Sequence, residues 1–239
     1  MRVSLMITCL ADQFFPEIGL ATVRLLRRLG VEVEFPEQQT CCGQPHFNSG
    51  YHADARELAR HALRVFTAKQ PVVVPSGSCA AMVKLEYPRL FESEPTWKAL
   101  ADSLAARTYE LSDFLVNVLG VEDVGARFPG KATYHMACHL RPLNRISEAE
   151  RLLRKVRDLE LIPLERYDEC CGFGGSFSVR YPEISGAMVN DKAALIEQSG
   201  ADYVVSTDAG CLMNIAGCLR RRNSRVQARH LAEILASEG

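Results

Sequence analysis

The tripeptide Cys-Cys-Gly occurs twice in this chain, in CCGQPHFNSGY at residues 41–51 and in CCGFGGSFSVRYPEISGAMVNDK at residues 170–192. In both copies another cysteine stands 32 residues before the first cysteine of the pair, and a further cysteine follows the pair. The two sets of four are Cys9, Cys41, Cys42 and Cys79, and Cys138, Cys170, Cys171 and Cys211. Spacing this regular among only 9 cysteines predicts an internal duplication.

The residues around the cysteines repeat in type as well. Each half has the pattern strand, helix, strand, CCG loop, helix, strand, cysteine and helix. A further helix is expected over residues 100–118, and residues 127–130 are expected to connect the halves. The predicted strands are residues 3–8, 31–35 and 71–75 in the first half, and 132–137, 161–164 and 203–206 in the second.

Alternating strands and helices predict an α/β fold in which two tandem, duplicated units each have a small parallel sheet flanked by helices. We place the N-terminal CCG unit, with its connecting helix, at residues 1–126 and the C-terminal CCG unit at residues 127–239. Every cysteine of the repeat follows a predicted strand. The carboxyl ends of parallel strands share one edge of a sheet, so the four thiols of each half are expected to converge there as metal-ligand loops.

Composition narrows the class of protein. The 28 basic and 29 acidic residues give a net charge of −1, which leaves no positive excess for nucleic acid. No stretch approaches the roughly 20 consecutive apolar residues that cross a bilayer, so the chain is not expected to be membrane-embedded. The apolar start ends at Asp12 without a cleavage site and is interpreted as a strand, so a cytoplasmic location is expected. In a reducing cytosol, patterned cysteines favour metal or redox chemistry.

Four converging thiolates could bind an iron–sulfur cluster, bind zinc, form disulfides or perform thiol chemistry. Zinc sites usually draw on closely spaced Cys-x2–4-Cys pairs, and neither half contains one. The side chains of adjacent cysteines point apart, so they can bind different iron atoms of a cluster more easily than they can bind one small ion. Glycines near the cysteine pairs have backbone amides that could donate hydrogen bonds to the bridging sulfides of such a cluster. The pattern favours one cluster per half and leaves zinc in one half, disulfides and thiol chemistry open.

Three further residues lie near the repeat or just outside it. His46 and His139 stand beside the ligand loops and could hydrogen-bond a sulfur. Cys218 stands outside the repeat and is expected to pack in the core.

The motifs resemble those of the cysteine-rich CCG-domain family, which includes the CCG-containing chain of heterodisulfide reductase and iron–sulfur subunits of glycolate and glycerol-3-phosphate dehydrogenases. The resemblance covers nearly the whole chain and is strongest to the members that serve lactate utilization. It implies an oxidoreductase subunit with 4Fe-4S-type clusters that transfers electrons in a cytoplasmic complex oxidising L-lactate to pyruvate. It also implies a ferredoxin-like iron–sulfur partner and a third small subunit. Besides the two CCG stretches, it rests on GADYVVSTDAGCLMNIAG at residues 200–217 and RHLAEIL at residues 229–235.

The chain departs from its heterodisulfide reductase relatives at one position in each half. In those relatives the motif ends in Cys-x-x-Cys, and five cysteines bind a non-cubane cluster. Here Met82 and Asn214 replace the last cysteine, so a four-cysteine cluster is the simpler expectation. No residue identifies a catalytic site for lactate. The alternatives are a structural zinc or scaffold subunit of a similar assembly, and an electron-transfer subunit for another 2-hydroxy acid such as glycolate.

Overall fold

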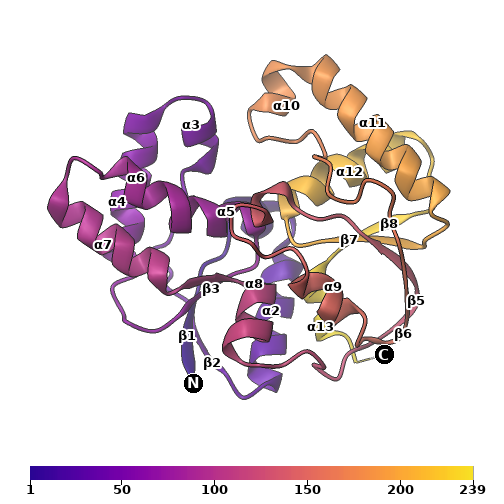
Figure 1. Cartoon of the computed structure of the whole chain (residues 1–239), viewed down its shortest axis with the longest axis horizontal. Coiled ribbons are helices and arrows are strands. Elements are labelled where there is room, and N and C mark those ends of the chain that lie inside the picture. The colour runs from indigo at the N-terminus through magenta and orange to yellow at the C-terminus, as the bar shows by residue number, and fades with distance from the viewer. Residues whose placement is uncertain (239) are drawn as a thin grey trace.

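Two four-stranded parallel sheets form the framework of the computed structural model, which describes residues 1–238 (Figure 1). The strand order is β2-β1-β3-β4 in the first sheet and β6-β5-β7-β8 in the second. The two sheets therefore have the same topology, which confirms the predicted α/β fold and the duplication. The strands are β1 (Arg2–Leu5), β2 (Glu32–Glu34), β3 (Val72–Val74), β4 (Thr108–Glu110), β5 (Arg127–Tyr134), β6 (Arg157–Ile162), β7 (Tyr203–Ser206) and β8 (Gln227–His230).

The central strands are apolar because helices cover them on both faces. All three valines of β3 are fully buried, and β7 is buried from Val204 onward. Continuous runs of β-branched residues are typical of strands in parallel sheets. Edge strand β2 instead alternates exposed and half-buried residues, as expected of a strand that has a neighbour on only one side.

The helices connect successive strands and cover the sheets. Helix α2 shows why its residues form a helix: Pro16 opens its first turn, its buried residues recur at helical spacing, and Gly30 follows its end with φ +76°. The α-helices are α1 (Cys9–Phe14), α2 (Pro16–Arg28), α3 (Gln44–Asn48), α4 (His52–Val65), α5 (Gly77–Ala81), α6 (Tyr87–Leu90), α7 (Pro95–Ala106), α8 (Leu111–Asp113), α9 (Glu148–Leu153), α10 (Phe177–Arg180), α11 (Pro182–Gln198), α12 (Ala209–Arg221) and α13 (Leu231–Ala236). Two π-helical segments, Met82–Glu86 and Phe114–Val118, and a 3-10 turn, Cys138–Leu140, complete the structure.

One large apolar core joins the two halves. It includes Val3 and Leu25 from the first half together with Val204 and Ile215 from the second. Helix α13 packs against α2, and the Arg28 guanidinium donates to the backbone oxygens at the end of α13. The two sheets are therefore held in a fixed relation by burial of shared apolar surface. The boundary between residues 126 and 127 stays a prediction.

The structure corrects two expectations about the elements between the cysteines. The helix predicted over residues 100–118 is interrupted, because α7 ends at Ala106 and β4 pairs with β3. The strand has only three residues, and the leucines on both sides of it stand at helical spacing. This spacing concealed the strand in the sequence. Residues 127–130 are not a connection but the start of β5. With β8, which was also missed, each sheet gains a fourth strand.

Candidate metal centre

Four of the eight repeated cysteines follow the central strands of the two sheets, and the two CCG pairs follow the edge strands β2 and β6. Cys9 is the first residue of α1, which follows β1, and Cys138 begins the 3-10 turn that follows β5. Cys79 and Cys211 are each the third residue of the helix that follows β3 or β7. The backbone amides of a helix N-terminus carry partial positive charge, so both latter sulfurs lie where negative charge is stabilised.

The thiols of the first half are in mutual contact. The Sγ atoms of Cys9 and Cys41 are 3.5 Å apart, and those of Cys42 and Cys79 are 3.1 Å apart. The thiol of Cys42 also hydrogen-bonds that of Cys41, which joins the two pairs. The amide of Gly43 donates to Cys41 Sγ at 3.5 Å. The four cysteines predicted to converge in this half thus form one group of four sulfurs.

The thiols of the second half repeat this arrangement. Cys170 accepts hydrogen bonds from the thiols of Cys138 and Cys171, and the amide of Gly172 donates to its Sγ at 3.4 Å. The Sγ atoms of Cys171 and Cys211 lie within 4.8 Å of each other. All nine cysteines of the chain are free thiols, and all nine belong to the described residues.

One thiol in each group has a strongly lowered pKa. Hydrogen bonds from Cys42 and Cys9 lower the pKa of Cys41 to about 2. Hydrogen bonds from Cys138 and Cys171 likewise lower the pKa of Cys170 to about 2. The remaining pKa shifts in these groups are upward, because the neighbouring thiols donate and are buried. Each group therefore supplies a thiolate, the form of cysteine that binds metal.

The glycine of each CCG motif is required by the backbone. Gly43 has φ +87° and Gly172 has φ +80°, a left-handed conformation that other residues adopt only with strain. A Cβ on Gly172 would lie 2.8 Å from the Ser185 oxygen and 2.9 Å from Met188 Cβ. At Gly43 the nearest atom would be the Ala55 oxygen, at 3.3 Å. This turn presents the cysteine pair to the sheet edge and directs the glycine amide toward the sulfur.

Both groups of thiols line a single cavity of about 550 Å³. The sequence predicted a separate site in each half, and the structure places both sets on the walls of one cavity. Ser76, Ser78 and Asp208 are among the lining residues, and Asp208 accepts from Ser76 Oγ at 3.0 Å and from the Ser78 amide at 3.0 Å. A second contact between the halves joins the Ser49 and Ser176 hydroxyls, which are 2.6 Å apart.

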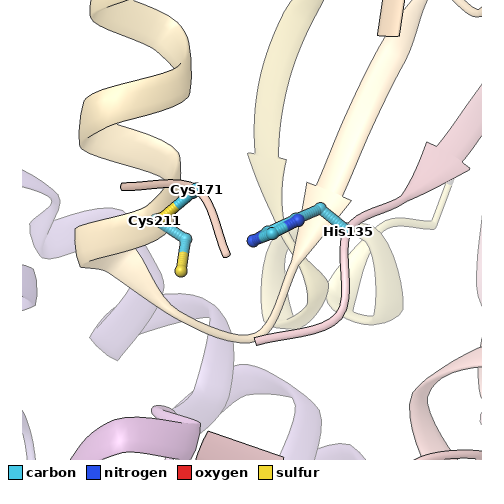
Figure 2. A group of neighbouring side chains, drawn as sticks. All are labelled: His135, Cys171 and Cys211. Atoms are coloured by element: carbon cyan, nitrogen blue, oxygen red, sulfur yellow. The ribbon is translucent and has the colours of Figure 1, made fainter. Parts of the chain in front are cut away.

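A histidine that the sequence reasoning missed lies in the second group. His135 follows β5, is 1% exposed, and points its ring toward Cys211 and Cys171 (Figure 2). One of its ring nitrogens and the two Sγ atoms lie within 4.8 Å of one another. Burial, followed by the charge of Lys192, lowers the pKa of His135 to about 4, so the ring is neutral. The feature of the sequence that could have identified His135 is its position three residues before Cys138.

The histidines that the sequence did single out are placed differently. The Nδ1 atom of His139 is 3.5 Å from Cys138 Sγ, so this histidine makes the contact with a sulfur that the sequence left open. His46 lies exposed on α3. Cys218 is buried in the shared core, which confirms its predicted packing role, and it donates to Asn190 Oδ1 at 3.3 Å.

The two positions that replace the fifth cysteine also differ from each other. Asn214 donates through Nδ2 to the Cys171 carbonyl oxygen at 2.9 Å. Met82 is buried in the apolar cluster that contains Cys42 and Cys79. In the first half the corresponding carbonyl, that of Cys42, accepts from Tyr87 Oη at 2.9 Å. In each half a side chain thus donates a hydrogen bond to a backbone carbonyl of the cysteine pair, but the donor stands at a different position in the two halves.

Comparison with known proteins shows the same duplication. The cysteine-rich domain of the CCG family matches residues 3–84 and again residues 132–216. Lactate utilization protein A of Geobacillus thermodenitrificans is 53% identical over 238 residues, which cover 98% of each chain. The chain belongs to the lactate utilization protein A family of CCG proteins. The member from Bacillus licheniformis is 52% identical over 99% of this chain and 100% of its own.

A solved structure shares the fold of this CCG protein. A hypothetical protein from Helicobacter pylori superimposes with a TM-score of 0.68 at 11% identity. The match covers 100% of this chain but 49% of the other, so this CCG protein spans about half the length of that protein. Within residues 1–238, every helix is too short or too polar to cross a membrane.

Proposed function

We propose that this protein is an iron–sulfur electron-transfer subunit of a complex that oxidises L-lactate to pyruvate. The observation that carries the proposal is the convergence of eight thiols, in two groups of four, on the walls of one cavity. Cys9, Cys41, Cys42 and Cys79 would bind one cluster, and Cys138, Cys170, Cys171 and Cys211 would bind the other. Each cluster would be of the 4Fe-4S type, with four cysteine ligands.

The residues present fit such a group. Each set contains a thiol with a strongly lowered pKa, a glycine amide directed at a sulfur, and a cysteine in the first turn of a helix. Amide donors and helix N-termini offset the negative charge of a thiolate-bound cluster and raise its reduction potential. The cavity of about 550 Å³ that both sets line has room for the inorganic atoms of a cluster, once the sulfurs, which are 3.1 and 3.5 Å apart in the first half, separate to bind different iron atoms.

Lactate as the source of electrons rests on the relatives, which are named for lactate utilization. The chemistry of lactate oxidation removes two electrons and two protons from a carbon that bears a hydroxyl. Hydride acceptors are cofactors, and we assign that step to partner subunits. These would be a ferredoxin-like iron–sulfur subunit and a third small subunit, assembled in the cytoplasm. Glycolate is the alternative substrate of the same class.

A structural zinc in the second half is the second candidate, favoured by one observation. A histidine nitrogen and two cysteine sulfurs form a compact buried group there, and this donor set suits zinc. In that case the protein would organise the complex and would not relay electrons through this half.

Anaerobic purification distinguishes the two candidates. We expect brown protein that contains iron and acid-labile sulfide in both halves and gives an electron paramagnetic resonance signal on reduction. Colourless protein with stoichiometric zinc would overturn the electron-transfer proposal. The substrate is tested with the reconstituted complex, in which L-lactate, and not glycolate, should reduce the clusters of this subunit. Equal reduction by glycolate would replace lactate with the broader class of 2-hydroxy acids.

A further inference from the structure

The two halves present different residues at one position beside their thiols. Met6 and His135 each stand three residues before the first cysteine of their set. Their backbones are equivalent, since the Met6 amide donates to Val73 at 2.9 Å and the His135 amide donates to Val205 at 2.8 Å. Met6 is buried with Cys42 and Cys79 in an apolar cluster, and His135 is buried beside the corresponding pair of cysteines.

The burial of His135 is costly unless something binds its ring. Neither ring nitrogen has a hydrogen-bond partner among residues 1–238, although both are inaccessible to solvent. An unsatisfied buried polar group costs about 1–3 kcal/mol, and native interiors contain few of them. A methionine fills the same position in the first half without this cost. A buried imidazole among thiols, with neither nitrogen bonded to the described part of the protein, therefore points to a metal group that binds through nitrogen.

The spacing of the three atoms matches ligands of one metal centre. A ring nitrogen of His135 and the sulfurs of Cys171 and Cys211 all lie within 4.8 Å of one another. With metal–sulfur bonds of about 2.3 Å and metal–nitrogen bonds of about 2.0 Å, two ligands of one ion lie at most roughly 4.3–4.6 Å apart. Figure 2 shows the ring of His135 directed toward Cys171 and Cys211. Small side-chain movements would bring all three onto one metal.

We propose that His135 is a direct imidazole ligand of the metal group in the second half, and that this ligand makes the second group chemically different from the first. The inference rests on the proposed function and deepens it. Imidazole is neutral, whereas thiolate carries a negative charge, so a cluster in which His135 takes the place of one of the four thiolates at an iron is easier to reduce than one bound by thiolates alone. The second group then has the higher reduction potential of the two.

Nitrogen coordination can be tested directly on the wild-type protein. Anaerobically prepared full-length protein is reduced, and its pulsed electron paramagnetic resonance spectrum is recorded with natural and with ¹⁵N-labelled histidine. We expect a strongly coupled nitrogen whose frequencies change with the label. A protein that contains iron and sulfide but shows no histidine nitrogen coupling overturns the inference, while the proposed function stands.

Three variants identify the residue responsible. His135→Met gives the second half the residue of the first, and we expect loss of the nitrogen coupling and a more negative second potential, with iron content kept by the four thiolates. His139→Gln is the matched control, because His139 contacts the sulfur of Cys138 and should not supply the coupling. Met6→His is the reciprocal change and should add a second coupled nitrogen. Coupling that survives in His135→Met or disappears in His139→Gln would overturn the assignment.

If the proposed function is wrong, the result is different: the protein takes up neither iron nor sulfide. In that event Co²⁺ alone is the probe, followed by its thiolate charge-transfer absorption. His135→Met should then weaken Co²⁺ binding in the second half by about tenfold or more, as loss of a metal-site residue typically does. Unchanged Co²⁺ affinity would overturn the role of His135 on its own terms.

Discussion

Two positions beside the thiols are apolar in the first half and polar in the second, since Met6 corresponds to His135 and Met82 to Asn214. At a third position, the neutral helix cap Ser76 corresponds to the acidic Asp208. The backbone framework of the two halves nevertheless matches in strand order and in the turns at the CCG glycines. The comparison shows that a duplicated scaffold can keep its ligand geometry while the chemistry around the ligands diverges.

A second difference lies in the surroundings of the two groups. Cys9 and Cys41 also line a second hollow of about 350 Å³ together with Asp12 and Glu37. His135, by contrast, lies inside the protein beside Cys171 and Cys211. The exposure of the thiols does not differ, because each group has two half-buried and two buried cysteines.

The largest expected effect concerns the independence of the two groups. Cys41→Ser and Cys170→Ser should each remove about half of the bound iron, because each half has its own four thiols. Iron and acid-labile sulfide per chain provide the measurement, and Cys218→Ser, which alters a core thiol, should leave both unchanged. Loss of all iron from either single change would show that the shared cavity holds one cluster in common.

The next effect is a pair of opposite pH dependences at equivalent helix caps. Glu110 ends β4 and caps α8, and His230 ends β8 and caps α13. Burial raises the pKa of Glu110 from an ordinary value of 4.5 to about 7. Burial lowers the pKa of His230 from 6.5 to about 4. A shift of this size corresponds to about 3 kcal/mol of unfolding free energy for each group.

The signs of the two effects follow from which state holds the proton. Folded Glu110 keeps its proton between pH 4.5 and about 7 while the unfolded carboxyl does not, so stability falls as pH rises through that window. Unfolded His230 takes up a proton between pH 6.5 and about 4 while the folded ring does not, so stability falls as pH drops. Denaturant unfolding across pH should show Glu110→Gln removing the first slope and His230→Asn the second. Unaltered slopes would contradict these assignments.

The CCG glycines should differ in their tolerance of a side chain. Gly172→Ala is expected to lower the unfolding free energy by about 2 kcal/mol or more, because strain at positive φ adds to a clash with the Ser185 backbone. Gly43→Ala should cost about 1 kcal/mol, since its Cβ contacts are looser. Thermal unfolding of the two variants under identical conditions checks the order. Gly50→Ala, at a glycine with positive φ and open space, is the control for strain alone. A smaller loss for Gly172→Ala than for Gly43→Ala would contradict the comparison.

The smallest effect concerns the donors that fix the cysteine pairs. Tyr87→Phe and Asn214→Ala each leave one buried carbonyl oxygen without its side-chain donor, which costs about 1 kcal/mol. We expect similar losses of stability in the two halves and little change in iron content. Asn214→Cys, which restores the fifth cysteine of the heterodisulfide reductase relatives, should alter the cluster spectrum if that position faces the metal. An unchanged spectrum would place the side chain outside the ligand group.

Much of the candidate site could be predicted from the sequence, because its spacing records the duplication directly. The eight repeated cysteines and the two CCG turns are visible as a period, and parallel strands bring such loops to one edge. The strands β4 (TYE) and β8 (QARH) escaped prediction because they lack a run of apolar residues, whereas the similarly short β3 (VVV) was recognised by its valines. His135 escaped because a lone histidine at a strand end carries no periodic signal.

The sequence by itself determined the α/β class, the duplication and which thiols belong to which half, because these depend on local patterns and on chain order. Only the tertiary structure decided that both groups share one cavity and that His135 lies beside Cys171 and Cys211. Those facts depend on how the two sheets pack through a common core and on hydrogen bonds between Ser76 and Asp208. Contacts between residues more than a hundred positions apart are selected by packing of the whole chain, and no local pattern encodes them.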